Sequence, residues 1–309
     1  MTALKIVFAG SPAAAVPSLR ALAETEHEVQ AVITREDSAQ GRSRAMAQTP
    51  VAEAAASLGI PLIKANRLAG DATTRVTALA PDLGVIVAYG ALVHDPLLSA
   101  PRLGWINLHF SLLPRWRGAA PVQRAIMAGD DVTGATVFQL VPELDAGAIF
   151  GRMTASIGRH QTAGNLLESL AESGAELLVS VVDALAAGTA RPEEQLGEPT
   201  TAAKLTVADG EIDWTRSAAQ IYDQIRGVTP EPGASTHVDG VRLKVLDAII
   251  AHGVVPLPPT VLALVGSAVL VGTATEPIQL ISVHPSGRKA MDAASWWRGR
   301  PAAASGSTQ

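Results

Sequence analysis

The chain has 309 residues, 48% of them hydrophobic and 17% charged, which is the composition of an ordinary globular protein and excludes a disordered one. Its length is sufficient for two domains with separate cores. The absence of cysteine excludes disulfides, thiolate metal sites and cysteine nucleophiles, and the net charge of −5 argues against a general attraction to nucleic acid or anionic membranes, although a local basic face is still allowed.

The amino terminus shows no basic segment followed by a long apolar stretch, so no secretory signal is expected. No run of about 18 apolar residues occurs that could cross a bilayer. We therefore expect a cytoplasmic protein with no membrane partner.

The first part of the chain alternates short apolar runs with helical patterns, which is typical of parallel βαβ units. We expect strands at Lys5–Ala9, Glu28–Ile33, Pro61–Lys64, Leu83–Val87, Trp105–His109, Ala135–Val141 and Ala148–Thr154. We expect helices at Ala13–Glu24, Val51–Ser57, Ala72–Leu79, Ala120–Ala128 and Thr162–Ala187. The pattern predicts an α/β domain over residues 1–187 with a doubly wound, mainly parallel sheet.

The second part of the chain follows a polar, proline-containing segment, which predicts a linker over residues 188–205. Beyond the linker we expect a helix at Ser217–Arg226 and strands at Ser235–His237, Val241–Ile250, Thr260–Leu264, Ala268–Val271 and Ile278–Val283. Short strands separated by Gly and Pro turns are typical of a small barrel, so we expect an OB-like β-barrel domain over residues 206–300. The tail, residues 301–309, is expected to lack ordered structure.

The turn after the first strand, Gly10–Pro12, resembles a nucleotide-binding turn only superficially. It lacks the G-x-G-x-x-G spacing with which a backbone approaches a pyrophosphate, and no GxxxxGK[ST] loop is present in the chain. A strand-to-helix turn with an early proline explains these residues, so a nicotinamide-dependent dehydrogenase is disfavoured.

Two polar residues, Asn107 and His109, end the apolar strand Trp105–His109. In a strand, residues two apart point to the same face, so both side chains are expected at the carboxyl end of one strand, where open α/β sheets bind ligands. The alternative is that both are core residues whose amide and imidazole groups only form hydrogen bonds with their buried neighbours. Ser111 nearby permits a serine hydrolase, but the G-x-S-x-G elbow of that class is missing.

A third polar residue, Asp145, stands in the turn Val141–Gly147 between two predicted strands. By itself it is typical of a solvated turn. Beside a histidine, however, an aspartate can orient the ring and stabilise its charged form. An amide, an imidazole and a carboxylate together suit acyl transfer to an amine: Asn107 can stabilise the developing oxyanion, and His109 and Asp145 can move the proton.

These residues also carry a family resemblance. Asn107-x-His109-x-Ser111-Leu-Leu-Pro114, followed about thirty residues later by Leu144-Asp145-Ala-Gly147, resembles the signature of the folate-dependent formyltransferases. The segment Arg115–Arg124 narrows the resemblance to the methionyl-tRNA formyltransferase type, and the likeness extends from Leu4 to about Trp297.

The resemblance implies a Rossmann-like catalytic domain and transfer of a formyl group from 10-formyltetrahydrofolate to the methionine α-amino group of initiator methionyl-tRNA, for translation initiation. It implies catalytic roles for Asn107, His109 and Asp145, and no metal. It implies that folate lies against Ser111, Leu112, Leu113 and Pro114 and against the segment with Ala88, Tyr89, Gly90 and Leu92. A monomer is expected.

The resemblance also assigns the insertion Arg35–Pro50 to binding the tRNA acceptor end, and the second domain to further tRNA contacts. We expect these contacts from Arg42, Arg44, Lys244, Arg288 and Lys289, with Arg298 and Arg300 as further candidates. Without the resemblance, the insertion is a polar surface loop of unusual length.

Three alternatives are open. A glycinamide ribonucleotide formyltransferase shares the core motif but normally ends after the first domain, and a folate-dependent sugar-nucleotide formyltransferase can have a similar two-domain plan. A noncatalytic module that binds tRNA or folate is disfavoured by the complete polar trio, because a binder needs no proton-transfer group.

Overall fold

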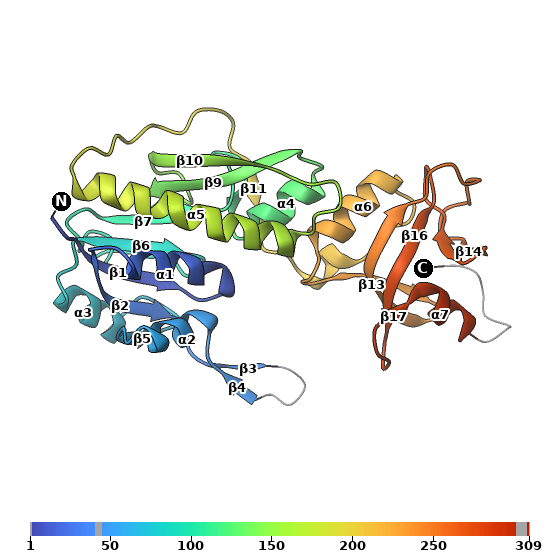
Figure 1. Ribbon diagram of the computed structural model, residues 1–309, viewed down its shortest axis with the longest axis horizontal. Coiled ribbons are helices and arrows are strands. Elements are labelled where there is room, and N and C mark those ends of the chain that lie inside the picture. Colours follow the sequence, from blue (N-terminus) through green and yellow to red (C-terminus); the bar gives the residue numbers. More distant parts are fainter. Residues whose placement is uncertain (1, 41–44, 301–307, 309) are drawn as a thin grey trace. The chain divides into compact units, whose positions relative to one another are not determined.

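The computed structural model describes residues 2–40, 45–300 and 308, which form two compact units (Figure 1). The first unit comprises Met1–Pro121, Val132–Ser156 and Leu167–Ala202, and the second comprises Val122–Asp131, Ile157–Leu166 and Ala203–Gln309. The predicted boundaries differ from this division in two respects. Residues 188–202 belong to the first unit, and two short segments before residue 187 belong to the second.

The first unit is built on a seven-stranded sheet with the order β10-β9-β7-β6-β1-β2-β5. Its strands are β1 (Lys5–Gly10), β2 (Glu28–Thr34), β5 (Leu62–Lys64), β6 (Leu83–Val87), β7 (Trp105–His109), β9 (Val132–Gln139) and β10 (Ile149–Ser156). The five strands from β5 to β7 are parallel, while β9 and β10 are antiparallel to their neighbours. The predicted mainly parallel α/β sheet is confirmed.

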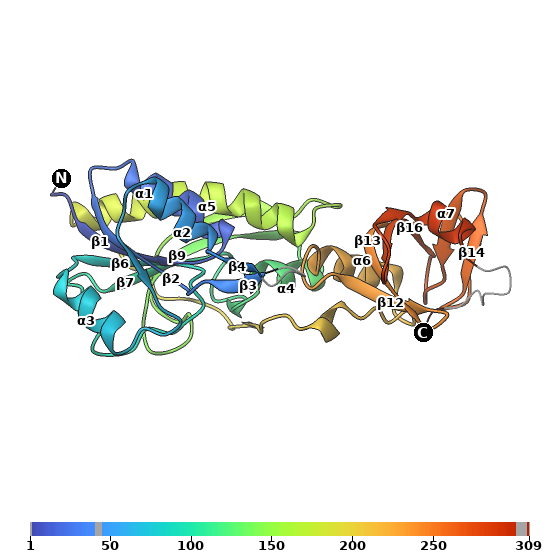
Figure 2. The ribbon, with the colours of Figure 1, turned by 90° about the horizontal axis from the view of Figure 1, so that it is seen from below.

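Helices cover both faces of this sheet, as apolar parallel strands require. Figure 2 shows α1 (Val16–Ala23), α2 (Pro50–Ser57) and α5 (Ala163–Ala186) on one side and α3 (Asp71–Ala78) on the other. Strand β6 is buried along its whole length. A Cβ at Gly84 in this strand would lie 2.1 Å from the Trp105 ring, so only glycine lets β6 pack against the neighbouring indole.

Two small pairings in the first unit were not expected from the sequence. Strands β3 (Ser38–Gln40) and β4 (Ala45–Ala47) pair antiparallel within the segment predicted as a loop. Strand β8 (Arg117–Gly118) pairs in parallel with β11 (Thr201–Ala202), which belongs to the segment predicted as a linker.

The second unit contains an antiparallel curled sheet of six strands in the order β12-β13-β16-β15-β14, with β17 paired to β16. These are β12 (Ala234–Val238), β13 (Val241–Ile250), β14 (Leu262–Val265), β15 (Ala268–Val271), β16 (Ile278–Pro285) and β17 (Met291–Asp292). The unit also includes α4 (Pro121–Met127) except for its first residue, η2 (Val207–Gly210), α6 (Ala218–Gly227) and α7 (Ala293–Arg298). The fold class predicted for this part of the chain is confirmed.

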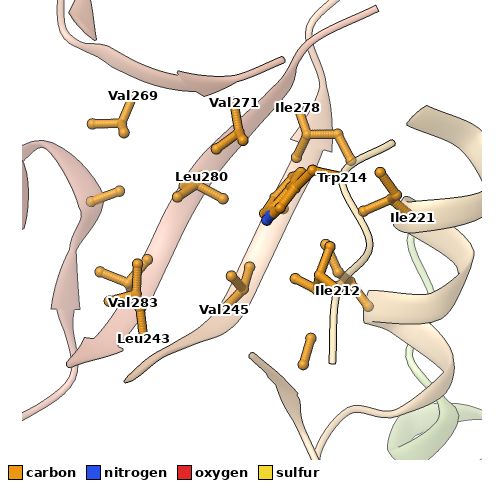
Figure 3. Close-up of a cluster of buried hydrophobic side chains, with 14 of the residues drawn as sticks. Ile212, Trp214, Ile221, Leu243, Val245, Val269, Val271, Ile278, Leu280 and Val283 are labelled. Atoms are coloured by element: carbon orange, nitrogen blue, oxygen red, sulfur yellow. The ribbon is translucent and has the colours of Figure 1, made fainter. Parts of the chain in front are cut away.

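Trp214 lies in the core of the second unit, only 2% exposed (Figure 3). Its ring packs among buried aliphatic side chains from three strands, Val245, Val271 and Ile278, and its Nε1–H donates to Thr236 Oγ1 over 3.0 Å. The indole is thus buried, and its one polar atom forms a hydrogen bond.

Among the helices of the described residues, none combines the length and apolar character needed to span a bilayer.

We predict that Trp214→Ala lowers the free energy of unfolding of the second unit by about 3–5 kcal/mol, because it leaves a cavity in a close-packed core. Urea unfolding followed by circular dichroism measures this change. Leu264→Ala, at a position 39% exposed on β14, is the matched control and should cost less than about 1 kcal/mol. Equal losses for the two variants would show that Trp214 does not support the core.

Candidate active site

The carboxyl end of β7 carries Asn107 and His109 two residues apart. This strand lies inside the sheet, between β6 and β9. Asn107 is half-buried and His109 is buried, at 6% exposure. Both polar groups therefore belong to a rigid element that neighbouring strands hold on either side.

Both ring nitrogens of His109 face oxygen atoms. Nε2 lies 2.8 Å from the carbonyl oxygen of Trp116, and Nδ1 lies 3.9 Å from Oδ2 of Asp145. Because a carbonyl oxygen can only accept, Nε2 must carry the proton and donate it. In the neutral ring, Nδ1 then presents a lone pair on the side of Asp145.

Burial lowers the pKa of His109 below its ordinary value of 6.5. The negative charge of Asp145 and the hydrogen bond to Trp116 oppose this shift but are smaller than the cost of burying a charged ring. His109 is therefore neutral at pH 7, and it is able to accept a proton.

Asp145 is 9% exposed, and its Oδ2 accepts a hydrogen bond of 2.7 Å from the backbone N–H of Gly118. Its φ of 48° lies in the left-handed region, which is uncommon for a residue with a side chain. Two residues further on, a Cβ at Gly147 would lie 1.7 Å from the carbonyl oxygen of Gln139, so the turn passes too close to β9 for any residue but glycine. The turn thus brings the carboxylate to the imidazole.

Asn107 carries an unpaired polar atom. Its Oδ1 is buried and has no hydrogen-bond partner among the described residues. A buried amide oxygen without a hydrogen bond is energetically unfavourable, so this atom indicates a bound ligand that supplies the missing hydrogen bond. Rotation of the amide by half a turn exchanges Oδ1 and Nδ2, so this position can offer an acceptor or a donor to a bound carbonyl.

The turn after β7, Ser111–Pro114, is fixed by β9. Thr136 donates its hydroxyl to the carbonyl of Ser111 over 2.7 Å and accepts from the N–H of Leu113 over 3.3 Å. Ser111 is fully buried, and its hydroxyl donates to the carbonyl of Arg115 over 2.6 Å. Leu112 is half-buried, whereas Leu113 and Pro114 are buried. The Ser111 hydroxyl is therefore held for structure, which does not fit a hydrolase nucleophile.

The segment after β6 offers backbone and small side chains to a ligand. Ala88, Gly90 and Leu92 are exposed, the last at 64%. Tyr89 instead points into the core, where burial raises the pKa of its hydroxyl, which donates to the carbonyl of Ala65. The side chain of Tyr89 therefore belongs to the core and does not face a ligand.

Arg35 also contacts the segment after β6. From the sequence it was assigned only to the insertion Arg35–Pro50. Its Nε donates to the carbonyl of Tyr89 over 3.3 Å, and its Nη2 donates to the carbonyl of Gly90 over 2.5 Å. It stands directly after β2, at the same carboxyl edge of the sheet as β6. Its position directly after a strand was the sequence signal for a place near the site. A basic residue in a polar loop has many possible roles, however, so this signal was not specific.

The basic residues predicted to bind tRNA separate into two groups. Arg42 and Arg44 lie outside the described residues. On the second unit, Lys244 of β13 pairs in register with His284 of β16, whose Nε2 donates to the carbonyl of Arg288 over 2.7 Å. Arg288 and the adjacent Lys289 are exposed. The structure thus brings Lys244 and Arg288 to one end of the β13–β16 ladder.

Arg298 and Arg300 differ in their surroundings. Arg298 is exposed, and its Nη2 donates to Ser295 Oγ over 3.0 Å. Arg300 forms an ion pair of 2.7 Å with Asp239 and lies 4.6 Å from the centre of the Trp297 ring. Arg300 therefore has a structural role in the second unit.

Two hollows occur elsewhere in the described residues. One, of about 500 Å³, lies between α1 and α5 and is lined by Arg20, Glu24 and Glu172, among others. The other, of about 490 Å³, belongs to the second unit and is lined by Tyr222 and Arg226, among others. Neither hollow is lined by His109 or Asp145. The candidate site is therefore identified by its hydrogen-bonding groups and not by the size of a hollow.

Comparison with known proteins identifies the family of this chain. Residues 4–182 match the family model described as formyl transferase, and residues 204–301 match the model described as formyl transferase, C-terminal domain. The chain belongs to the formyl transferase family. The first matched region covers most of the first unit together with two short segments of the second unit, and the polar trio lies within it.

Three relatives define the likeness more closely. The chain is 55% identical over 296 residues to a methionyl-tRNA formyltransferase of Clavibacter sepedonicus, with 96% of this chain and 97% of the relative covered. The methionyl-tRNA formyltransferase of Clostridium thermocellum superposes with a TM-score of 0.58 at 18% identity, covering 81% of this chain and 95% of that one. An N-formyltransferase of Helicobacter canadensis, solved with folinic acid and dTDP-3-aminofucose, gives a TM-score of 0.69 at 16% identity, with 90% and 98% covered. The two structures support the fold.

The lowered pKa of His109 predicts a pH-dependent contribution to stability. The unfolded chain takes up a proton on this histidine near its ordinary pKa, whereas the folded chain takes it up only at lower pH. The contribution is therefore fully present above about pH 6.5 and is lost as the pH falls below it.

We predict that His109→Gln flattens this dependence, so that the variant loses less free energy of unfolding than the wild type between about pH 7.5 and about pH 5.5. Urea titrations across this range measure the effect. His94→Gln, at an exposed position in the same unit, is the control and should keep the slope of the wild type. A wild-type slope in the His109 variant would contradict the assignment.

Proposed function

We propose that this protein transfers the formyl group of 10-formyltetrahydrofolate to the α-amino group of methionine on initiator methionyl-tRNA, for translation initiation. The observation that carries the proposal is that His109 and Asp145 meet at the end of β7, on the strand that also carries Asn107, whose buried Oδ1 has no hydrogen-bond partner among the described residues. The identity of 55% to a methionyl-tRNA formyltransferase supports the choice of acceptor. Such a function places the protein in the cytoplasm, and we propose that it acts as a monomer.

The trio matches the proton balance of formyl transfer. The amine nitrogen forms a bond to the formyl carbon and loses a proton, and the donor nitrogen gains one as its bond to that carbon breaks. His109 is neutral and can take the proton at Nδ1, where Asp145 stabilises the charged ring. The Asn107 amide can donate to the formyl oxygen as negative charge develops there, which is the role of an oxyanion hole.

The folate donor is proposed to bind between the two segments that flank the trio. The segment with Ala88, Tyr89, Gly90 and Leu92, in which all but Tyr89 are exposed, offers backbone hydrogen-bonding groups to a pterin ring, and the turn at Ser111, Leu112, Leu113 and Pro114 forms the other wall. Folinic acid in the Helicobacter canadensis enzyme supports a folate ligand for this fold. No metal is required by this chemistry.

The tRNA is proposed to bind through local basic residues, because the net charge of −5 gives no general attraction. Lys244, Arg288 and Lys289 supply such a local face on the second unit. Arg42 and Arg44, in the insertion after β2, are proposed to contact the acceptor end.

We predict that Asn107→Ala, His109→Ala and Asp145→Ala each reduce formyl transfer to methionyl-initiator tRNA by about 100-fold or more, because each removes a group that acts in the transition state. Single-turnover transfer from 10-formyltetrahydrofolate measures the rate, and fluorescence titration measures folate binding, which should stay near the wild-type value. His94→Ala is the control. Near-normal turnover in all three variants would refute the catalytic roles.

The same assay distinguishes the acceptors. The wild-type protein is tested with methionyl-initiator tRNA, with a dTDP-amino sugar and with glycinamide ribonucleotide. We expect turnover of the charged tRNA only. Efficient turnover of a small amine without turnover of tRNA would replace the proposed function with one of the alternatives, and no turnover of any acceptor would favour a binding module.

We predict that Arg35→Met raises the KM for the folate donor about fivefold, the factor that corresponds to about 1 kcal/mol of lost hydrogen bonding. The variant frees the carbonyls of Tyr89 and Gly90 and so loosens the proposed pterin segment. Arg75→Met is the matched control, since Arg75 also donates to one carbonyl, that of Leu62, at an exposed site. An unchanged KM in the Arg35 variant would show that this segment needs no such support.

A further inference from the structure

The segment from Glu193 to Ala202, here called the bracing segment, lies against both loops that flank His109. At its start, the backbone of Glu193 exchanges hydrogen bonds of 2.7 and 2.8 Å with Ile149 at the beginning of β10. At its end, β11 pairs with β8. In a simple linker, the backbone polar groups would form hydrogen bonds with water. In the bracing segment, backbone groups at both ends instead form hydrogen bonds with the first unit.

Thr200 holds the residue whose carbonyl orients His109. Trp116 has a φ of 62°, a left-handed conformation that is unfavourable for a large side chain. Its N–H donates to the Thr200 hydroxyl over 2.9 Å, and the next N–H along, that of Arg117, donates to the Thr200 carbonyl over 2.8 Å. Thr200 also donates its own N–H to the carbonyl of Pro114 over 3.3 Å. Thr200 thus forms three hydrogen bonds to the loop in which Trp116 adopts this unfavourable conformation.

Gln195 holds the other neighbour of His109. Its Nε2 donates to the carbonyls of Asp145 and Gly147 over 2.8 and 2.9 Å, which fixes the turn in which Asp145 also has a left-handed φ of 48°. Its Oε1 accepts from Nε and Nη2 of Arg117 over 3.2 and 2.6 Å. One side chain therefore ties the Asp145 turn to the loop that contains Trp116.

We infer that Gln195 and Thr200 are positioning residues for the formyl transfer proposed above. They hold the two backbone turns that place a carbonyl at Nε2 and a carboxylate near Nδ1 of His109. The carbonyl selects the tautomer with the proton on Nε2, which leaves Nδ1 free to take the proton of the amine. When Trp116 relaxes, the proton can move to Nδ1 and the ring can no longer act as a base at that nitrogen.

The kinetic test uses variants that change one group at a time. Thr200→Val removes the acceptor for Trp116, while Thr200→Ser keeps it. Gln195→Glu keeps an acceptor for Arg117 but cannot donate to the two carbonyls. We expect Thr200→Val and Gln195→Glu to lower kcat by about 10- to 100-fold with KM values for both substrates within about threefold of the wild type, because geometry is lost but substrate contacts are kept.

Two variants separate positioning from general support of the fold. Thr200→Ser should retain kcat close to the wild type. Glu193→Gln, in the same segment, removes the exposed ion pair of 3.3 Å with Arg152 but no contact to the two turns, and should leave kcat unchanged. An equal loss in Thr200→Ser and Thr200→Val, or an equal loss in Glu193→Gln and Gln195→Glu, would overturn the inference.

A spectroscopic test needs no acceptor substrate. Imidazole nitrogen NMR of the chain, which has seven histidines, reports the tautomer of each ring, and His109→Gln identifies the signals of His109. We expect the Nε2–H tautomer in the wild type, Thr200→Ser and Glu193→Gln, and a mixture of tautomers in Thr200→Val. An unchanged tautomer in Thr200→Val would overturn the role of Thr200.

The two tests distinguish this inference from the proposed function. A wild-type protein that leaves methionyl-tRNA unmodified refutes the proposed function, while the tautomer of His109 still decides whether Thr200 positions the ring. An active wild-type protein with near-normal kcat in Thr200→Val and Gln195→Glu refutes the positioning roles alone.

Discussion

The site depends on a buried imidazole whose two nitrogens are constrained differently. The hydrogen bond from His109 Nε2 to the Trp116 carbonyl fixes the tautomer, and Asp145 Oδ2 lies 3.9 Å from Nδ1. These groups come from a strand, the loop after it and a later turn, so the arrangement forms only when three parts of the chain meet. The parallel sheet makes this possible because the carboxyl ends of its strands lie at one edge.

Burial decides the charge state of this site. A nearby carboxylate alone would favour a protonated histidine, yet the cost of burying the charged ring is the larger effect, and the pKa of His109 is lowered. A neutral ring beside a carboxylate is suited to take up a proton and then to have the resulting charge stabilised. Asn107, with an unpaired oxygen in its amide, completes the set by offering a polar group that no described residue uses.

The sequence was informative where local patterns decide the structure. Apolar runs marked the strands, and the rule that residues two apart share a face brought Asn107 and His109 together. Asp145 could be added because a carboxylate beside an imidazole has a chemical purpose, although its left-handed backbone was not predictable. Composition misled at residues 188–205: polar residues and prolines are typical of linkers, and no local signal reveals that Gln195 and Thr200 find partners about 50 and 84 residues away. The contacts of Arg35 with the segment after β6 could not be predicted either, because Arg35 lies in a polar segment that composition marks only as a surface loop.

The polar character of the bracing segment has a physical explanation in the loops that it contacts. Each turn beside His109 leaves backbone groups without partners in its own strand, because a left-handed residue interrupts regular pairing. Thr200 supplies an acceptor for the Trp116 N–H, whereas the Asp145 turn presents carbonyls and needs a donor. Glutamine is suited to the second position because its amide donates to two carbonyls while its oxygen accepts from Arg117, and neither glutamate nor lysine has both groups. A segment that looks like a linker by composition can therefore be polar because it completes the hydrogen bonding of the two turns beside His109.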